Sequence, residues 1–147
     1  MNKSGMRKAF FGLEPKSIRS LVVISPIIYP TQFEKVYGQA GKHEKSILSY
    51  LIANYRDLTF IKTPMTQAAV SDLVVLLKGT KCKRIVFLGA IGGLSEELEI
   101  GDVVTVENAG KIKSVSSIHE ETTANLKKWK KAGYVGLDFE TEAFFSV

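Results

Sequence analysis

Residues Arg84-Ile-Val-Phe-Leu88, followed by Gly89-Ala-Ile-Gly-Gly93, are the stretch that decides the fold of this chain. The first part is apolar almost throughout, as expected of a strand that is covered by helices on both faces of its sheet. The glycines end this strand abruptly, allow close approach of the backbone and supply N–H donors. Two interpretations stay open: the glycines only turn the chain, or they line a ligand site.

Strands and helices are predicted to alternate around this stretch. Short apolar runs predict strands at residues 21–24, 58–61, 103–106 and 134–137. These strands and the intervening helices predict an α/β layered sandwich, with a central, mostly parallel sheet flanked by helices.

The helices are predicted from periodicity and charge. Apolar residues recur at the helical period over residues 43–55 and again over 69–77. Residues 120–132 begin with acids and end with lysines, the polarity that the helix dipole favours. Residues 140–145 have the pattern of the opening turns of one more helix, which is too short to be stable without packing support.

Length and composition narrow the class of protein. The chain has 147 residues, 20 Lys and Arg against 15 Asp and Glu, and 45% hydrophobic residues, which is ordinary for a globular protein. We expect a single domain over residues 1–147. Cys82 is the one cysteine, so no internal disulfide can form, which fits a reducing compartment such as the cytoplasm. No apolar run reaches the roughly 18 residues of a spanning helix, and no membrane contact is expected.

Three segments are expected to meet at one edge of the sheet, because ligands of open α/β sheets collect at the carboxyl ends of the strands. They are residues 63–66, 89–93 and 138–140. The glycine stretch matches neither the dinucleotide fingerprint G-x-G-x-x-G nor a Walker A loop. A nicotinamide-dependent enzyme and a P-loop ATPase are therefore disfavoured.

The same segments resemble a known family in their order and spacing. The matching stretches are Thr63-Pro-Met-Thr-Gln67, Val86-Phe-Leu-Gly-Ala-Ile-Gly-Gly-Leu94, Leu98-Glu-Ile-Gly-Asp-Val-Val104 and Leu137-Asp-Phe-Glu-Thr-Glu-Ala-Phe-Phe145. Together they are similar to the signposts of the nucleoside phosphorylase and nucleosidase superfamily. The likeness runs from about Leu58 to Val147.

This resemblance implies cleavage of the N-glycosidic bond of a purine or pyrimidine nucleoside. Glu140 stands at the position of the carboxylate that grips the ribose hydroxyls and faces the positive charge that develops on the sugar. Phe139 would pack under the nucleoside. The remaining substrate-binding residues implied by the resemblance are Thr63, Met65, Gly89, Ala90, Ile91 and Gly92. We expect a homo-oligomer that binds a small-molecule nucleoside and uses no cofactor or metal.

Departures from the family pattern shape the expected reaction. Phe87 and Ala90 stand where phosphorolytic members carry an arginine and a hydroxyl residue, and neither can bind a phosphate dianion. Hydrolysis is therefore favoured over phosphorolysis, although residues 24–27 lack the glutamate with which the nucleosidases activate water. The family's general acid is an aspartate on a strand that would follow Val147, so we expect a member shortened or truncated at its C-terminus. A catalytically inactive nucleoside-binding or scaffold subunit is the alternative.

Other polar residues are given structural roles. We expect Asp138 to cap a helix and Glu142 to be a solvated residue of its first turn. Four lysines surround Trp129, which leaves a small basic nucleic-acid-binding domain as a weaker alternative. In the favoured interpretation, the four lysines lie on the solvent-exposed face of a helix whose Trp129 and Ala132 point inward.

Overall fold

The computed structural model describes residues 5–8, 12, 14–105 and 111–147. Its first part holds seven elements in the order β1 (Leu21–Ser25), α2 (Pro30–Tyr37), β2 (Lys42–Lys45), β3 (Leu51–Asn54), β4 (Leu58–Lys62), α3 (Gln67–Leu77) and β5 (Arg84–Phe87). The second part holds β6 (Gly92–Gly93), β7 (Lys111–Ser114), a 3₁₀ turn at Ile118–Glu120, α4 (Thr123–Lys131), β8 (Tyr134–Asp138) and α5 (Thr141–Phe145).

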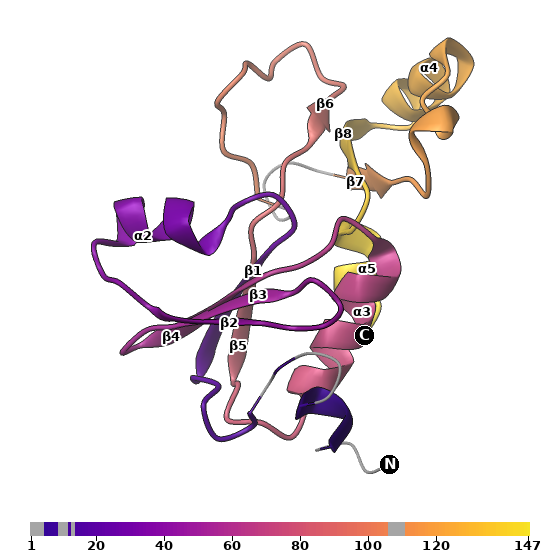
Figure 1. Cartoon of the computed structure of the whole chain (residues 1–147). Helices are drawn as coiled ribbons and strands as arrows, with labels where there is room; N and C mark the ends of the chain where they lie inside the picture. The colour runs from indigo at the N-terminus through magenta and orange to yellow at the C-terminus, as the bar shows by residue number, and fades with distance from the viewer. Residues whose placement is uncertain (1–4, 9–11, 13, 106–110) are drawn as a thin grey trace.

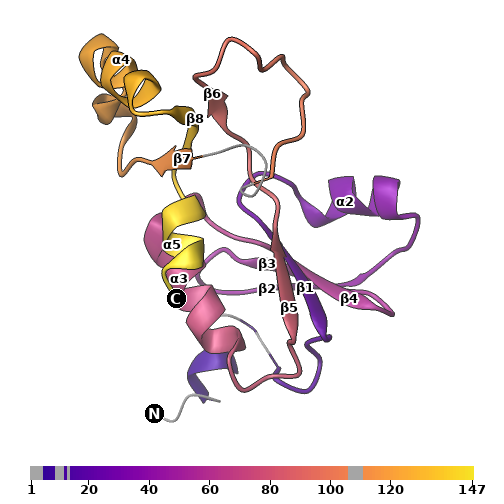
Figure 2. The same cartoon turned by 180° about the vertical axis from the view of Figure 1, so that it is seen from behind.

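The strands form two separate sheets (Figure 1). The larger sheet has the order β2-β3-β4-β1-β5, in which β1 pairs in parallel with both β4 and β5. The smaller sheet has the order β6-β8-β7, and β8 pairs in parallel with β7. The small sheet lies beyond the carboxyl ends of β1 and β5, which is the edge where ligands are expected in such folds (Figures 1 and 2).

Helices cover both faces of the larger sheet (Figures 1 and 2). On one face, Val22, Ile24 and Ile61 pack with buried residues of α3. On the other face, Val23 and Phe60 pack against the aromatic side chains of α2. Successive strand residues point to opposite faces, so each central strand must be apolar on both sides to fill the two layers.

The ends of α3 follow from its sequence. Thr66 precedes the helix with extended backbone, and its hydroxyl accepts a hydrogen bond from the N–H of Ala69 at 3.2 Å. Gly79 follows the helix with a φ of 80°, a conformation that glycine adopts without strain. The predicted helix over residues 69–77 and its terminal glycine are thus confirmed.

The layered α/β architecture is confirmed, and most of the predicted strands are present. The strands predicted at 21–24, 58–61, 84–88 and 134–137 correspond to β1, β4, β5 and β8, and the helix predicted at 120–132 corresponds to α4. The large sheet is mixed, because β2-β3 and β3-β4 are antiparallel pairs.

The helix predicted over residues 43–55 is wrong. This segment is the β2-β3 hairpin, in which Ile52 and Ala53 are buried on opposite faces of the sheet. Ile47 and Leu48, which contributed to the helical period, lie at the exposed turn of the hairpin. A strand buried on both faces has consecutive apolar residues, and here they coincide with helical spacing.

Three further expectations need correction. Residues 103–105 form no strand, and Val103 is 91% exposed, while Val106 lies outside the described residues. The strand β5 is an edge strand and not a covered one, since Val86 is 44% exposed. Trp129 is buried as predicted, but Ala132 is exposed because the helix ends there.

Candidate functional site

A cavity of about 260 Å³ lies where the chain leaves the strands β1, β4, β5 and β8. Its lining comprises Pro26, Ile27, Met65, Glu121 and residues 90–92 and 137–140. The segments are far apart in the sequence, and they meet because the parallel strands place their carboxyl ends at one edge. The lining of this hollow between the two sheets is mostly apolar or uncharged, and its charged residues are acidic.

Most of the predicted site residues border this cavity. They are Met65, Ala90, Ile91, Gly92, Phe139 and Glu140. Thr63 and Gly89 do not border it. Thr63 is fully buried below it at the end of β4, where its N–H donates to the carbonyl of Ser25 at 2.9 Å. Their grouping follows from the topology, and their binding roles stay a prediction.

Glu140 is the residue of this cavity with an unmet hydrogen-bonding need. Its side chain is only 4% exposed, and its Oε1 atom is buried without a hydrogen-bond partner in the described part of the chain. Burial, and secondarily the neighbouring charge of Asp138, raise the pKa of Glu140 to about 7. A hydroxyl donor that entered the cavity would satisfy this oxygen and favour the ionised form.

Asp138 is also buried, but its oxygens are fully engaged. One carboxylate oxygen accepts a hydrogen bond from the Ser114 hydroxyl at 2.5 Å. The other accepts from the backbone N–H of Thr141 at 2.9 Å and from the Thr141 hydroxyl. Asp138 therefore fastens the start of α5 to β7 and accepts the N–H of the first helical residue, although the N-cap position itself is held by Glu140 and not by Asp138.

Glu142 adds further hydrogen bonds between α5 and β7. Its carboxylate accepts hydrogen bonds from the ammonium of Lys113 at 2.7 Å and from the N–H of Ser114 at 3.3 Å, and its own N–H donates to the Ser114 hydroxyl at 2.8 Å. The effect is that α5 and β7 hold the backbone around Glu140 in place.

The glycine turn is shaped by a close approach to β8. A β-carbon placed on Gly136 would lie 2.6 Å from the Cδ1 atom of Ile91 and 3.2 Å from its Cβ atom. Glycine at this position of β8 is thus what lets Ile91 sit at the cavity wall. Nothing in the sequence around Gly136 marks this contact, so sequence analysis missed its role.

Sequence analysis also missed Pro26, Ile27 and Glu121. The first two follow β1 directly, so the rule that placed the other segments at the carboxyl edge could have found them. Glu121 follows the 3₁₀ turn, and no motif in the sequence signals its approach to the cavity.

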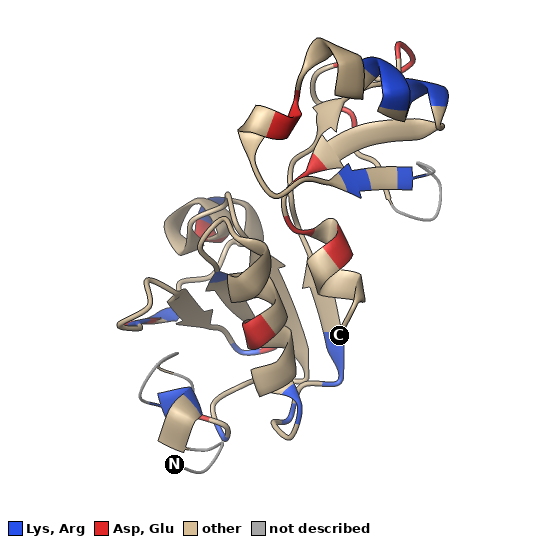
Figure 3. Ribbon diagram, turned by 90° about the vertical axis from the view of Figure 1, so that its right-hand side faces the viewer, with Lys and Arg blue, Asp and Glu red and all other residues tan. Residues whose placement is uncertain are grey.

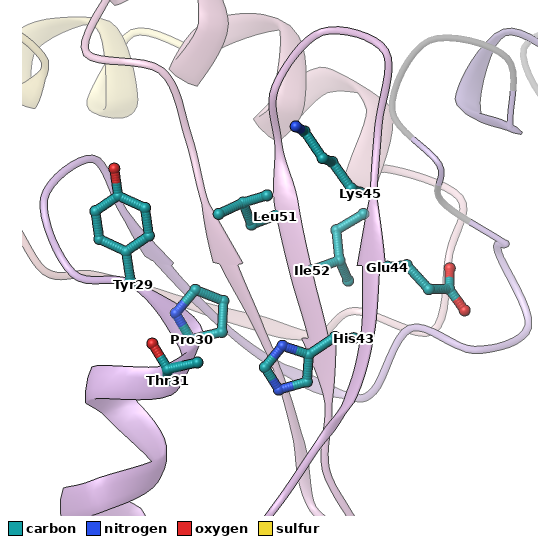
Figure 4. A pocket seen from close by; sticks show the side chains of 8 residues that line it. All are labelled: Tyr29, Pro30, Thr31, His43, Glu44, Lys45, Leu51 and Ile52. Carbon is teal, nitrogen blue, oxygen red and sulfur yellow. The ribbon is translucent and has the colours of Figure 1, made fainter.

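A second cavity, of about 240 Å³, lies between the start of α2 and the β2-β3 hairpin (Figure 4). His43 borders it, and its Nε2 atom lies 2.6 Å from a carboxylate oxygen of Glu34. Glu34 in turn accepts the N–H of Gly41 at 2.7 Å, which holds the pKa of that carboxyl below its usual range. These bonds connect α2 to the hairpin, and none of the predicted site residues borders this cavity.

Lysines gather on α4 and β7 (Figure 3), and none of them is among the residues that line the cavity. One of them, Lys130, forms an ion pair with Glu96 at 2.6 Å. Among the described residues no three metal-ligating side chains lie together, and none of the helices there is long and apolar enough to cross a bilayer. Burial raises the pKa of the Cys82 thiol, which disfavours a nucleophilic role.

The structure of this chain is similar to those of known proteins. The chain matches no protein-family model and no curated protein sequence. Its structure is similar to that of AMP nucleosidase from Bacteroides thetaiotaomicron VPI-5482, with a TM-score of 0.71 and 16% identity over 98% of this chain and 80% of that chain. It is also similar to uridine phosphorylase from Vibrio fischeri ES114, with a TM-score of 0.68 and 14% identity over 94% of this chain and 77% of that chain.

This chain has a nucleoside phosphorylase-like fold. The resemblance seen in the sequence motifs is thereby confirmed at the level of structure. In this nucleoside phosphorylase-like fold, the cavity beside Glu140 is at the carboxyl edge of the sheet, where the glycine turn and β8 meet.

Proposed function

We propose that the cavity beside Glu140 binds a nucleoside and that the chain cleaves its N-glycosidic bond. One observation carries this proposal: the carboxylate of Glu140, a residue that is 4% exposed, borders the cavity, and its Oε1 atom lacks any hydrogen-bond partner in the described residues. Vicinal ribose hydroxyls are donors that suit this acceptor. The fold, which is that of nucleoside-processing enzymes, supports the same ligand class.

The chemistry follows from the charge of the transition state. As the bond between C1′ and the base nitrogen breaks, positive charge develops on the ribose ring. An ionised Glu140 in a site of low dielectric stabilises that charge more strongly than water would. Phe139 and Ile91 supply apolar surface beside Glu140 for the sugar and the base.

Water is the proposed nucleophile, in preference to phosphate. Phe87, at one of the positions where phosphorolytic relatives hold phosphate, packs in the core and stacks on Phe144 with 5.2 Å between ring centroids. Ala90, at the other position, borders the cavity without a polar side chain. The acidic residues around the cavity add repulsion toward a phosphate dianion.

A catalytically inactive nucleoside-binding subunit is the second candidate. It is favoured by the contacts of Asp138, whose oxygens are committed to three hydrogen bonds with Ser114 and Thr141 within the protein. Such a subunit would bind nucleosides through Glu140 and release no base.

Turnover and binding assays separate these candidates. Inosine, uridine, adenosine and methylthioadenosine are each incubated with the protein, with and without phosphate, while free base and melting temperature are measured. Release of base without phosphate supports hydrolysis, and stabilisation without release supports the binding subunit. Glu140→Gln should weaken binding about tenfold or more, because it removes a charged acceptor, whereas the exposed Glu97→Gln should change nothing. No stabilisation by any of the nucleosides would contradict the proposal.

A further inference from the structure

The charged side chains that border the proposed nucleoside cavity are all acidic. They are Glu121, Asp138 and Glu140, and no Lys, Arg or His of the described part of the chain lines it. On the adjoining strand β7, Lys113 forms an ion pair with Glu142 at 2.7 Å. The cavity therefore presents a negative potential to its ligand, because the rest of its lining is apolar or uncharged.

The three acids differ in what they offer a ligand. Asp138 contributes charge but no free acceptor, because its oxygens are engaged by Ser114 and Thr141. Glu140 is more than nine-tenths buried and has a free acceptor oxygen. Glu121 is an exposed residue at the rim. A ligand in the cavity is thus offered one hydrogen-bond acceptor, on Glu140, together with the negative charges of Asp138 and Glu121.

On the basis of the proposed nucleoside site, we propose that its preferred ligand is an N-riboside whose base carries a positive charge. N-ribosyl pyridinium compounds, of which N-ribosyl nicotinamide is an example, are the chemical class that fits. Their hydroxyls would meet Glu140, and their cationic ring would be attracted by the three carboxylates. A 5′-phosphate on the same compound would be repelled.

Bond cleavage in this class needs no proton donor. When the bond between C1′ and the pyridinium nitrogen breaks, both electrons go to the nitrogen and the base leaves as a neutral pyridine. The oxygen of water then bonds to C1′ and one proton passes to the solvent, so the products are ribose, the neutral base and a proton. This fits a cavity in which the oxygens of Asp138 are already committed to three hydrogen bonds within the protein.

Calorimetric titration with four probes tests the charge preference. The probes are N-ribosyl nicotinamide, its uncharged 1,4-dihydro form, its 5′-phosphate, and inosine. At about pH 8, where Glu140 is ionised, the cationic riboside should bind about tenfold or more tightly than the dihydro form, which has nearly the same shape. The 5′-phosphate should bind more weakly than the cationic riboside.

Variants identify the source of the preference. Glu121→Gln should narrow the ratio between the cationic and the dihydro form, while Glu97→Gln, away from the cavity, should keep it unchanged. Equal binding of inosine, the cationic riboside and its dihydro form would overturn the charge preference but leave the nucleoside site standing. Binding of none of the four probes would overturn both.

Discussion

The two sheets of this molecule differ in how they are held together. The central strands of the five-stranded sheet are buried on both faces, between α3 on one side and α2 on the other. The three-stranded sheet is supported by a small cluster in which Val115, Trp129 and Leu137 are the buried members. The polar fastening of Asp138 to Ser114 and Thr141 supplements this small core. Stability is thus concentrated in the first sheet, and the second carries the side chain proposed for function.

The largest effect is expected in the five-stranded sheet. Phe60 is fully buried, and its ring stacks on Phe33 with 4.5 Å between centroids. Phe60→Ala should lower the free energy of unfolding by about 3–5 kcal/mol, through lost burial and a residual cavity. Urea unfolding measures the loss. Val36→Ala is the control: Val36 is 91% exposed, so this substitution should change the free energy of unfolding little. If Phe60→Ala lowered the free energy of unfolding no more than the control does, the claim that stability is concentrated in the five-stranded sheet would be wrong.

The second prediction concerns the free energy of unfolding that is lost because Glu140 is buried between the two sheets. Its pKa is raised from an ordinary 4.5 to about 7 by burial and by Asp138, so its ionisation opposes folding. The contribution of this group to the free energy of unfolding should be greatest below about pH 4.5. It should fall by about 3 kcal/mol as the pH rises to about 7 and change no further above that.

Glu140→Gln should remove that loss, because the amide does not ionise. Unfolding in urea at about pH 5 and about pH 8 should give a much smaller difference for this variant than for the wild type. If both proteins show the same difference, the buried environment of Glu140 is not as described.

The third prediction tests the close packing of Ile91, in the glycine turn, against Gly136 of β8. Gly136→Ala should cost about 1–3 kcal/mol, because the new β-carbon would overlap with Ile91. It should also weaken nucleoside binding, since Ile91 borders the cavity. Gly92→Ala is the matched control for stability, because a β-carbon there meets no atom within 4 Å. Equal melting temperatures for the two variants would contradict this packing.

The smallest effect is expected on the outer helix of the small sheet. The ion pair between Lys130 and Glu96 lies at the surface, where solvent and salt screen it. Lys130→Ala should leave both the melting temperature and nucleoside binding within experimental error. A clear loss of stability would show that α4 supports the small sheet more than the buried Trp129 alone suggests.

The large sheet was the easier part to predict from sequence. Its central strands β1 and β4 have short apolar runs that are typical of strands covered on both faces. The β2-β3 hairpin escaped prediction because consecutive buried residues in β3 have the same spacing as one face of a helix. The short strand β7 has the sequence Lys-Ile-Lys-Ser, which carries too little apolar pattern to be recognised.

The candidate site was predictable where it depends on topology. The segments after β4, β5 and β8 meet because parallel strands end at one edge, and their sequences show where those strands end. Glu121 and the contact of Gly136 with Ile91 depend on how the small sheet packs, which no local pattern encodes. The raised pKa of Glu140 likewise follows from burial in the folded chain.

The most direct test of the account compares inosine with 2′,3′-dideoxyinosine by calorimetric titration, using the wild type and Glu140→Gln. If Glu140 accepts hydrogen bonds from the ribose hydroxyls, the wild type should bind the dideoxy compound about tenfold or more weakly. The variant should discriminate between the two compounds much less, because its amide oxygen is only a neutral acceptor. Equal affinity of the wild type for the two compounds would contradict the central claim.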